Sequence, residues 1–351
     1  MKVDRFVILT GNHHFFGQTR KPWVSMNVDQ MVDVFKVHGW NPEVFPFHAV
    51  ANGKVSIQNA LVLYTFSQKI NRRQYILDVV RFLDDGTNVL IPRYDLLKCH
   101  ENKGYQELYK RRLHIVSLDA FYFSKFEEVA EYPIHYPMVL KSVDTSNGKG
   151  VFLVRSEKEL KKRVYRLERQ NIGTLLDLFR RKYFRLPKHY PEYPEYSNRE
   201  DYLQYRDYIL KEKNFILQEY VPGLDFDYRV VGMYGKYFVI KRFAFKGDFR
   251  ASGTKKHDYW VVVEPSLLDF AESIFQKFDT PFLAMDIGVQ NGRFCLFEFQ
   301  ALHFGINSIL RTPGFYQKEN SGWRFTEARS KIETELAEAL VRYASAKGIM
   351  G

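Results

Sequence analysis

Short apolar runs alternate with amphipathic stretches over the N-terminal part of the chain. The apolar runs lie at residues 6–9, 61–64 and 88–91, and the stretches between them, such as MVDVFKVHGW and YILDVVRFLDDG, have helical spacing. Runs that are apolar on both faces are typical of a parallel sheet covered by helices, and Gly86 is placed to end the helix before the third run. The pattern predicts an α/β N-terminal lobe that ends near Pro92.

The middle of the chain predicts a second lobe with an insertion. Ser156 and Glu159 form the sequence signature of a capping box, and residues 171–213 are rich in Tyr, Pro and charge. That segment lacks a clear apolar period at its start and regains helical spacing at 202–210, so we expect an inserted loop followed by a helix. The other elements expected here are a helix at 103–113, strands at 138–141 and 151–154, and a helix at 157–170.

The last part of the chain predicts a strand-rich lobe. Pro265 is well placed at the first position of a helix, and Gly348 follows the final helical stretch. The expected strands are at 215–220, 228–233, 237–243, 282–290 and 294–300, and the expected helices are at 265–278 and 326–346. We therefore predict an α+β protein with an α/β N-terminal domain at 1–94, a central subdomain at 95–214 and a C-terminal subdomain at 215–351.

Length, composition and cysteine content indicate the class of protein and its compartment. The chain has 351 residues, of which 45% are hydrophobic, so it is long enough for several packed lobes. Cys99 and Cys295 are the only cysteines, which excludes a disulfide framework and a Cys-rich zinc site and fits the reducing cytoplasm. The apolar stretch at residues 6–10 is too short for a signal-peptide core or a membrane span.

The net charge of +11 would attract nucleotides, acidic metabolites, anionic polysaccharide or nucleic acid. The 52 Lys and Arg residues are dispersed and form no single basic run, which argues against a dedicated nucleic-acid binder. The net charge alone therefore does not select one of these partners.

A first candidate site lies in the segment YPMVLKSVDTSNGKGVFLV. Lys141 ends an apolar strand, and Ser146, Gly148 and Gly150 belong to the small polar loop that follows. Glycines let backbone N–H groups approach phosphate oxygens, and a strand-end lysine supplies a point charge. An ordinary glycine-containing hairpin explains this segment equally well.

A second, longer segment carries more information. FILQEYVPGLDFDYRVVGMYGKYFVIKRFAFKGDFRASG places Gln218, Glu219, Tyr220 and Val221 on a strand that leads to a Pro-Gly turn. This segment resembles the ATP-grasp superfamily, and within it the branch of ribosomal-protein glutamate ligases and other carboxylate-amine ligases. The resemblance extends over residues 95–345.

The resemblance implies a three-lobed ATP-grasp fold in which ATP is held between two α+β subdomains. It assigns Gln218 to Val221 to the adenine, and Asp225 or Asp227 to the ribose, with Asp225 favoured. The family's D-x-R element corresponds to Asp227-Tyr228-Arg229, its basic strand to Lys241-Arg242, and its G-D-F-R element to residues 247–250.

The resemblance also implies a second phosphate lysine and a metal site. Lys103 is the best match for that lysine, although Asn102 stands where the family has Asp. In FLAMDIGVQNGRFCLFEFQ, the residues Asp286, Glu298 and Gln300 match the acidic ending that holds Mg2+ (or Mn2+), with Gln in place of the family's Asn.

Strand geometry tests this metal assignment. Glu298 and Gln300 are two apart on a strand and therefore share a face. A two-residue turn at Asn291-Gly292 would place Asp286 opposite Phe297, whereas a three-residue loop would place it opposite Glu298. We therefore predict the three-residue loop, with the alternative of an ordinary amphipathic hairpin.

These residues together predict a mechanism. A substrate carboxylate attacks the γ-phosphorus of ATP, with Lys103 and Lys141 spreading the phosphate charge, and an amine then attacks the resulting acyl phosphate. Arg242 and Arg250 suit the developing oxyanion and the departing phosphate, the alternative for each being a surface ion pair. His13 and His14 follow the first strand and are candidates for substrate contact, or are merely exposed.

Other interpretations stay open. The chain could be a nucleotide-binding regulatory or scaffold protein without ligase activity, or a phosphotransferase. The substrates could be amino acids, peptides, or a uronic-acid-bearing metabolite or surface polysaccharide. The tyrosines of residues 171–213 could line an acceptor groove or cover a homodimer contact.

Overall fold

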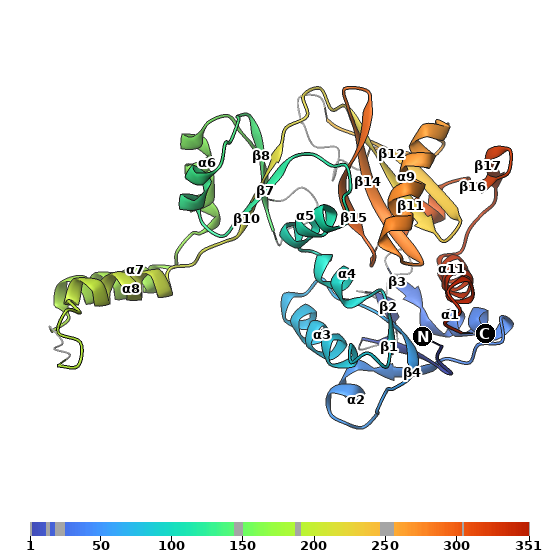
Figure 1. The fold of residues 1–351 in the computed structure, drawn as a ribbon, viewed down its shortest axis with the longest axis horizontal. Coiled ribbons are helices and arrows are strands. Elements are labelled where there is room, and N and C mark those ends of the chain that lie inside the picture. The colour runs from blue at the N-terminus through green and yellow to red at the C-terminus, as the bar shows by residue number, and fades with distance from the viewer. Residues whose placement is uncertain are drawn as a thin grey trace. The chain divides into compact units, whose positions relative to one another are not determined.

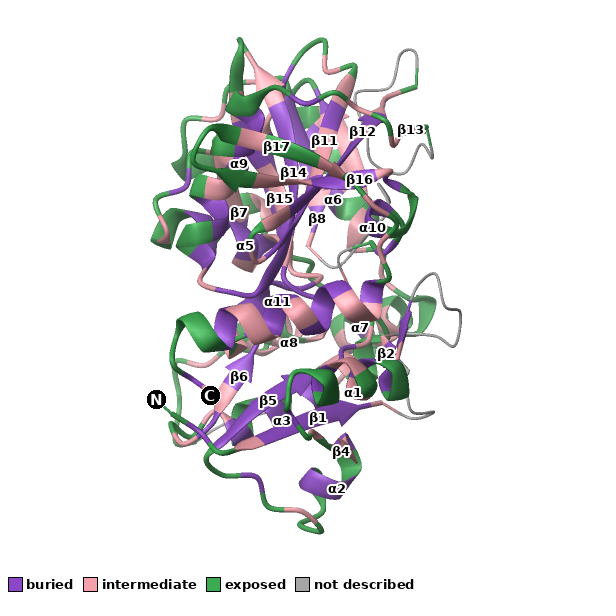
Figure 2. Ribbon diagram, turned by 90° about the vertical axis from the view of Figure 1, so that its right-hand side faces the viewer, coloured by how far each residue is buried: buried purple, intermediate pink, exposed green. Residues whose placement is uncertain are grey.

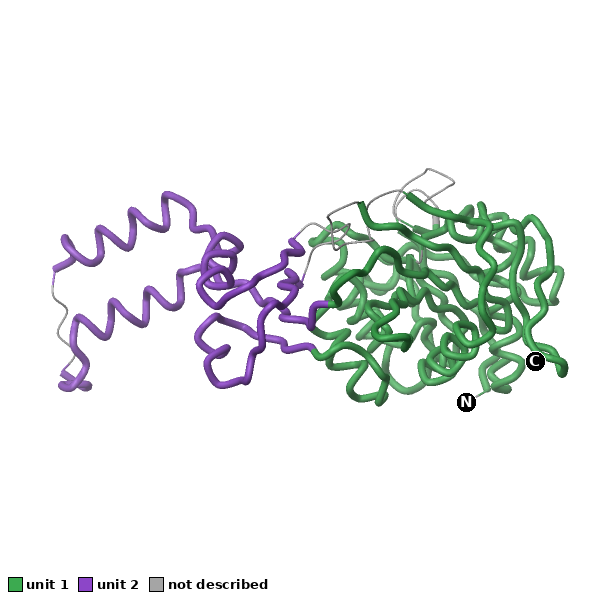
Figure 3. Tube along the Cα trace, turned by 90° about the horizontal axis from the view of Figure 1, so that it is seen from above, with its two compact units in different colours: residues 1–119, 144–149, 221–351 green, residues 120–143, 150–220 purple. Residues whose placement is uncertain are grey.

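The structure is a computed structural model that describes residues 2–11, 15–17, 25–143, 150–186, 191–245, 256–303 and 305–350. The chain forms two compact units (Figures 1 and 3). Unit 1 contains the chain up to Asp119 and from Val221 onward, and unit 2 contains Ala120–Val143 and Gly150–Tyr220. The division into three parts at residues 94 and 214 stays a prediction.

The N-terminal part of unit 1 is the expected parallel sheet. Its strands run in the order β4-β1-β5-β6, and every neighbouring pair is parallel. The strands β1 and β5 are buried over almost their whole length (Figure 2). The bounds are β1 Arg5–Thr10, β2 Phe15–Gly17, β3 Ser25–Asn27, α1 Val28–Val37, β4 Glu43–Pro46, α2 Phe47–Ala51, β5 Ala60–Tyr64, α3 Ile70–Leu83, β6 Val89–Ile91, α4 Tyr94–Cys99 and α5 Lys103–Arg112.

Helices cover both faces of this sheet, as the doubly apolar runs predict. Side chains of α1 and of the C-terminal helix α11 (Ile332–Ala346) pack on the face that carries Phe6 and Ile8. Side chains of α2 and α3 pack on the opposite face, which carries Val7 and Leu9. The packing of α11 ties the two ends of the chain together, because it belongs to the same core as β1.

The second sheet of unit 1 is the one that carries the candidate acids. Its strands run in the order β15-β14-β11-β12-β16-β17, and the short β13 pairs with β12. The helix α9 covers one face with the apolar residues of its buried side. The bounds are β11 Phe226–Met233, β12 Lys236–Phe243, β13 His257–Asp258, α9 Pro265–Phe278, β14 Phe282–Gln290, β15 Arg293–Gln300, α10 Asn307–Arg311, β16 Gly314–Glu319 and β17 Gly322–Glu327.

The final helix is shorter than expected. It begins at Ile332, and the residues from Gly314 to Glu327 form the hairpin β16–β17 instead. The prediction of a helix from residue 326 is therefore wrong at its start. Alternating side chains such as Trp323 and Phe325 suit a strand, and Gly322 has φ +119°, a conformation that a residue with a side chain rarely adopts.

Unit 2 is built on a four-stranded antiparallel sheet in the order β7-β10-β8-β9. One face packs on α6 around Leu140, Leu160 and Leu217. Ser156 accepts a hydrogen bond from the Glu159 backbone N–H as expected, but the Glu159 carboxylate accepts from the Arg155 N–H, so the capping box is incomplete. The bounds are β7 Ala120–Phe123, η1 Phe126–Glu131, β8 Met138–Ser142, β9 Val151–Val154, α6 Glu157–Leu167, α7 Ile172–Phe184, α8 Asn198–Ile209 and β10 Phe215–Glu219.

The insertion is a pair of helices, so the expected loop at its start is wrong. The helix α7 occupies that position, and Asn171 caps it by accepting a hydrogen bond from Thr174 N–H. The helix α8 follows with a complete capping box between Ser197 and Glu200. Within the described residues, no helix is long and apolar enough to cross a membrane, and both cysteines are buried thiols.

Candidate functional site

The hairpin β14–β15 places the candidate acids Asp286 and Glu298 opposite each other by an unexpected route. The turn contains only Asn291 and Gly292, with φ +49° and +74°, as in a type I′ turn. The predicted three-residue loop is therefore wrong. A β-bulge next to Asp286 shifts the register, so that Ile287 pairs with Leu296 but Asp286 pairs with Glu298. The extra residue is Phe297, which has no partner on β14.

A glycine makes room for this bulge. A Cβ atom at Gly288 would lie 2.0 Å from Phe297 Cζ, so the ring of Phe297 occupies the space above the Gly288 backbone. A glycine inside a strand often marks such a close approach. The pair Gly288 and Phe297 therefore determines which residue lies opposite Asp286.

Two arginines neutralise the buried carboxylate of Asp286. Arg242 on β12 donates to both oxygens of Asp227, from Nε at 2.6 Å and from Nη2 at 2.7 Å. The same Nη2 lies 2.9 Å from Asp286 Oδ2. Arg229 on β11 lies opposite Asp286, with its Nε at 3.5 Å from Asp286 Oδ1, and it donates from Nη2 to Gln300 Oε1 at 2.9 Å.

The charges of this cluster depend on each other. Burial opposes the charge of Arg242, but Asp286 and Asp227 outweigh that effect and keep the pKa of the guanidinium above its usual value. Asp286 Oδ1 is buried and makes no hydrogen bond within the described residues. A buried carboxylate oxygen without a hydrogen bond is costly unless a cation satisfies it.

The helix α5 positions β15 from one side. Lys103 at its first turn lies with Nζ 3.5 Å from Glu298 Oε1, and Asn102 caps the helix by accepting from Tyr105 N–H. Further along the same face, Lys110 donates to the carbonyl oxygen of the bulged Phe297 at 3.3 Å and is paired with Glu107 at 2.8 Å. Lys110 is 1% exposed, so this ammonium is a buried support for the bulge.

The donor set fits a small hard cation. Mg2+ prefers oxygen ligands and is usually held by one or two protein carboxylates together with substrate phosphates. Asp286 and Glu298 supply two carboxylates, and Gln300 supplies an amide oxygen two residues further along the strand. No group of three or more His, Cys, Asp or Glu suited to a metal occurs among the described residues.

Unit 2 carries the other predicted nucleotide residues. Lys141 on β8 lies opposite Ile216, and Gln218 lies opposite Val139, so Lys141 and Gln218 share one face of the sheet. That face is opposite to the one that packs on α6. Gly150 has φ +72° and its carbonyl accepts from Ser142 N–H at 2.9 Å, which closes the strand pair that carries Lys141.

The two candidate ribose acids differ in environment. Asp227 is 4% exposed and is bound through both oxygens by Arg242. Asp225 is exposed and precedes β11. The geometry therefore favours Asp225 as the carboxylate open to a hydroxyl group. Glu219 ends β10, Tyr220 is the last residue of unit 2, and the buried Val221 begins the return to unit 1.

Several predicted site residues lie outside the described residues: His13, His14, Ser146, Gly148 and Arg250. Of the residues that the structure describes, it brings Lys103, Arg242, Asp286, Glu298 and Gln300 together in unit 1.

Sequence reasoning assigned no role to Arg229 or to Lys110. Arg229 belongs to the D-x-R element, and the pairing register of β11 with β14 would have predicted its position opposite Asp286. Lys110 follows Lys103 by two helical turns, and that spacing places both on one face of α5. The bulge that Lys110 supports leaves no comparable signal in the sequence.

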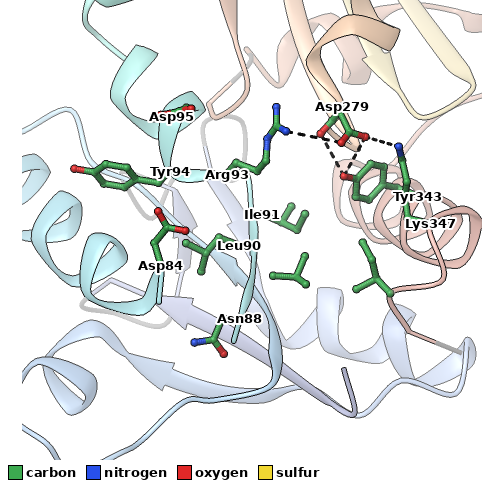
Figure 4. Close-up of a pocket in the computed structure, with 12 residues that line it drawn as sticks. Asp84, Asn88, Leu90, Ile91, Arg93, Tyr94, Asp95, Asp279, Tyr343 and Lys347 are labelled. Atoms are coloured by element: carbon green, nitrogen blue, oxygen red, sulfur yellow. Dashed lines mark hydrogen bonds and ion pairs between the residues drawn. The ribbon is translucent and has the colours of Figure 1, made fainter. Parts of the chain in front are cut away.

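A cavity of about 480 Å³ lies elsewhere in unit 1, against β6 and α11 (Figure 4). Within its lining, Asp279 is paired with Lys347, whose Nζ lies 2.7 Å from Asp279 Oδ1, and with Arg93, whose Nη1 lies 3.8 Å from Asp279 Oδ2. None of the acids of β14 and β15 lines it. It therefore contributes nothing to the chemistry of the acidic hairpin.

No family model matches the chain, and the search of curated proteins finds no match to its sequence. Solved structures are similar over nearly the whole chain. D-Alanine–D-alanine ligase from Bacillus anthracis, complexed with ATP, is 12% identical with a TM-score of 0.51, covering 98% of both chains.

Two further structures give the same result. The D-cycloserine synthetase DcsG is 12% identical with a TM-score of 0.54, covering 96% of this chain and 99% of its own. The ATP-grasp ligase PsnB, complexed with a precursor peptide and AMPPNP, is 11% identical with a TM-score of 0.51, covering 98% of both chains. At identities this low, the structural similarity shows a shared fold and nothing further.

The bulge generates a first prediction. Gly288→Ala should destabilise the protein by about 1–3 kcal/mol, because the new methyl group overlaps the Phe297 ring. Urea unfolding measures this change. Gly173→Ala is the matched control, since its Cβ would make only an ordinary 3.5 Å contact with Oδ1 of the capping residue Asn171, and it should leave stability unchanged or raise it. Equal stability of the two variants would contradict the packing described for the bulge.

The support from α5 generates a second prediction. Lys110→Met should lower the free energy of unfolding by about 3 kcal/mol or more, because it leaves the buried Glu107 carboxylate without its cation. Arg81→Met, which breaks the exposed Arg81–Asp84 pair, should cost less than about 1 kcal/mol. The two are compared by urea unfolding, and a cost for Lys110→Met as small as that of the control would show that the buried pair does not support the hairpin.

Proposed function

We propose, from the premise that this chain has the ATP-grasp fold, that it is an ATP-dependent carboxylate-amine ligase. The observation that carries the proposal is the register of β14 and β15, which sets Asp286 against Glu298 with Gln300 beside them. Acids in this arrangement suit the binding of Mg2+ together with the phosphates of ATP. The ligases among the similar structures support this class of reaction.

The residues of this chain would act on the phosphates and on the reacting carbonyl. Mg2+, held by Asp286, Glu298 and Gln300, would neutralise the negative charge of the phosphates. Lys103 already lies beside Glu298, and we assign Lys141 on β8 as the second lysine for the phosphate oxygens. Gln218 to Val221 would contact the adenine, and Asp225 the ribose.

Two bond-forming steps follow. A carboxylate oxygen of the first substrate attacks the γ-phosphorus, the bond to the bridging oxygen of ADP breaks, and an acyl phosphate forms. The amine nitrogen then attacks the carbonyl carbon, phosphate departs with the bonding electron pair, and the nitrogen loses a proton to give the amide. Arg242 and Arg250 would hold the oxyanion of the second step.

The residues of the site support a type of reaction and do not select one pair of substrates. An amino acid or a peptide is our first candidate for the amine and the carboxylate. D-Alanine–D-alanine ligase and the peptide-bound PsnB, as their names state, support that choice by analogy of fold alone. A uronic-acid-bearing metabolite or polysaccharide is the second candidate, because the net charge of +11 favours acidic ligands.

A turnover assay tests the reaction. The purified protein, given Mg2+, ATP and pools of carboxylates and amines, should release ADP and phosphate only with a matching pair. Glu298→Gln should lower this rate by about 100-fold or more, because a metal contributes several kcal/mol to the transition state. Glu43→Gln, an exposed acid on β4, is the matched control and should keep the rate.

Three other outcomes of the assay would each support a different function. Release of AMP would mean an adenylate intermediate and would contradict the acyl-phosphate route. A stable phosphorylated product that needs no amine would mean a phosphotransferase. Tight ATP binding without turnover in every pool would support the regulatory or scaffold alternative.

The two ribose candidates give a further prediction. Asp225→Ala should raise the KM for ATP about tenfold with little change in stability, because it removes one hydrogen bond to a hydroxyl. Asp227→Asn should instead lower the free energy of unfolding by about 3 kcal/mol, because it weakens a buried ion pair with Arg242. ATP titration and urea unfolding of both variants decide between them, and the opposite pattern would move the ribose contact to Asp227.

A further inference from the structure

The segment that contains β13 is held against two strands of the second sheet of unit 1. His257 pairs with Arg242 across the ladder between β13 and β12. Four residues further along, the carbonyl oxygen of Val261 accepts a hydrogen bond from the hydroxyl of Tyr316 on β16 at 3.1 Å. The backbone from His257 to Val261 is therefore fixed at both of its ends.

Strand register places His257 on the face of the sheet that carries the candidate acids. Residues directly opposite each other on antiparallel strands point to the same face. His257 lies opposite Arg242, which lies opposite Asp227. Arg229 is two residues beyond Asp227 on β11 and lies opposite Asp286. His257 is therefore on the same side of the sheet as the two arginines that approach Asp286.

The helix α10 packs on this same face. Its residue Ile309 belongs to one apolar core with Val231, which lies two residues from Arg229 on β11. Just before α10, a Cβ atom at Gly305 would lie 3.6 Å from the guanidinium carbon of Arg229, so this backbone covers that side chain. The exposed Arg311 ends α10 and is thereby brought to the face of the acids.

Tyr259 joins Arg311 to His257. Its hydroxyl group lies 3.1 Å from Nδ1 of His257, and the two rings meet edge to face with their centres 5.8 Å apart. The guanidinium carbon of Arg311 lies 5.7 Å from the centre of the Tyr259 ring, within the range of a cation–π contact. The three side chains come from two elements of unit 1 and form a single cluster.

The cluster carries positive charge that no described acid balances. Arg311 forms no ion pair with any residue that the structure describes. Burial lowers the pKa of the His257 ring below its usual value. Three guanidinium groups lower this pKa further, those of Arg242, Arg229 and Arg311. Positive charge gathered in this way around a neutral ring suits the binding of an anion.

We propose that Arg311 and His257 form a subsite for an anionic group of the amine substrate, a carboxylate or a phosphate that takes no part in the reaction. The inference rests on the proposed ligase function, in which Arg242 on the same face holds the oxyanion of the amide-forming step. A planar guanidinium can donate two parallel hydrogen bonds to such a group.

The subsite would discriminate between classes of amine. A simple amine is a cation at neutral pH, and the guanidinium groups repel it. An amino acid, or another amine that carries an acidic group, offsets this repulsion with its own anion. The substrate class that follows is an amine with a carboxylate or phosphate on the same molecule.

The first test is the turnover assay with three matched sets of amines: amino acids, amino alcohols esterified with phosphate, and the amides of the same amino acids. ADP should be released with one of the two acidic sets and not with the amides. The set that reacts distinguishes a carboxylate from a phosphate. Equal rates with amino acids and with their amides would overturn the subsite.

The second test changes Arg311. Arg311→Ala should raise the KM for the reacting amine by about 10- to 100-fold, because it removes a charge-assisted hydrogen bond, and should leave the KM for ATP unchanged. Arg311→Lys, which keeps the charge without the planar fork, should lie between the wild type and Arg311→Ala. Arg324→Ala, at an exposed arginine on β17, is the matched control and should keep both KM values. An unchanged KM for the amine in Arg311→Ala would contradict the proposal.

The third test needs no turnover. Nitrogen-15 NMR of histidine-labelled protein follows the His257 ring, assigned by the loss of its signals in His257→Gln. Inorganic phosphate or acetate, added at constant ionic strength, should raise the pKa of His257, because a bound anion favours the imidazolium form. Arg311→Ala should abolish most of this rise. No rise with either anion, or an equal rise in Arg311→Ala, would overturn the subsite.

These tests separate failure of the subsite from failure of the ligase function. A rise of the His257 pKa that requires Arg311, in a protein that turns over no ATP with any amine, would retain the anion subsite and reject the ligase. ATP turnover that is equal with amino-acid amides, and unaffected by Arg311→Ala, would retain the ligase and reject the subsite.

Discussion

Two carboxylates directly opposite each other on neighbouring strands, Asp286 and Glu298, are the constraint on which the rest of the site depends. Like charges in this position destabilise a sheet, and burial makes the repulsion worse. The surrounding structure is therefore organised to compensate. Arg229 on the neighbouring strand β11 and Arg242 on β12 approach Asp286, and Lys103 approaches Glu298 from α5. A cation bound between the two acids would relieve the same repulsion, which links the stability of the hairpin to the chemistry we propose for it.

The neighbouring cations do not provide a hydrogen bond to both oxygens of Asp286, and this suits the binding of a ligand cation. Asp286 Oδ2 is close to Arg242, whereas Oδ1 is buried without a hydrogen bond among the described residues. Gln300 is already oriented, because its amide oxygen accepts from Arg229. The glutamine side chain is longer than asparagine by one methylene, and this hydrogen bond fixes where its oxygen lies. The second arginine therefore serves both the charge of Asp286 and the position of the amide.

The insertion differs from the two sheets in where its apolar side chains lie. The sheets bury their apolar residues within their own unit, as in ordinary domains. In the hairpin α7–α8, ion pairs and a stacked guanidinium hold the helices together, and the apolar residues face outward. Exposed ion pairs contribute little to stability, so such a hairpin gains most from covering its outer face. The polar interior and the apolar exterior are therefore two consequences of the same sequence pattern.

The sequence by itself determined the parallel N-terminal sheet, the helix Pro265–Phe278 and the strands Phe282–Gln290 and Val151–Val154, because periodicity and end signals are local. The resemblance to the ATP-grasp superfamily singled out the acids as a group, and strand spacing places Glu298 and Gln300 on one face. Tertiary structure alone decided how Asp286 reaches Glu298: a bulge requires the Phe297 ring to fit over Gly288 and a buried Lys110 to bind the freed carbonyl. Those contacts join residues that are far apart in sequence or on different elements, and no local pattern encodes them.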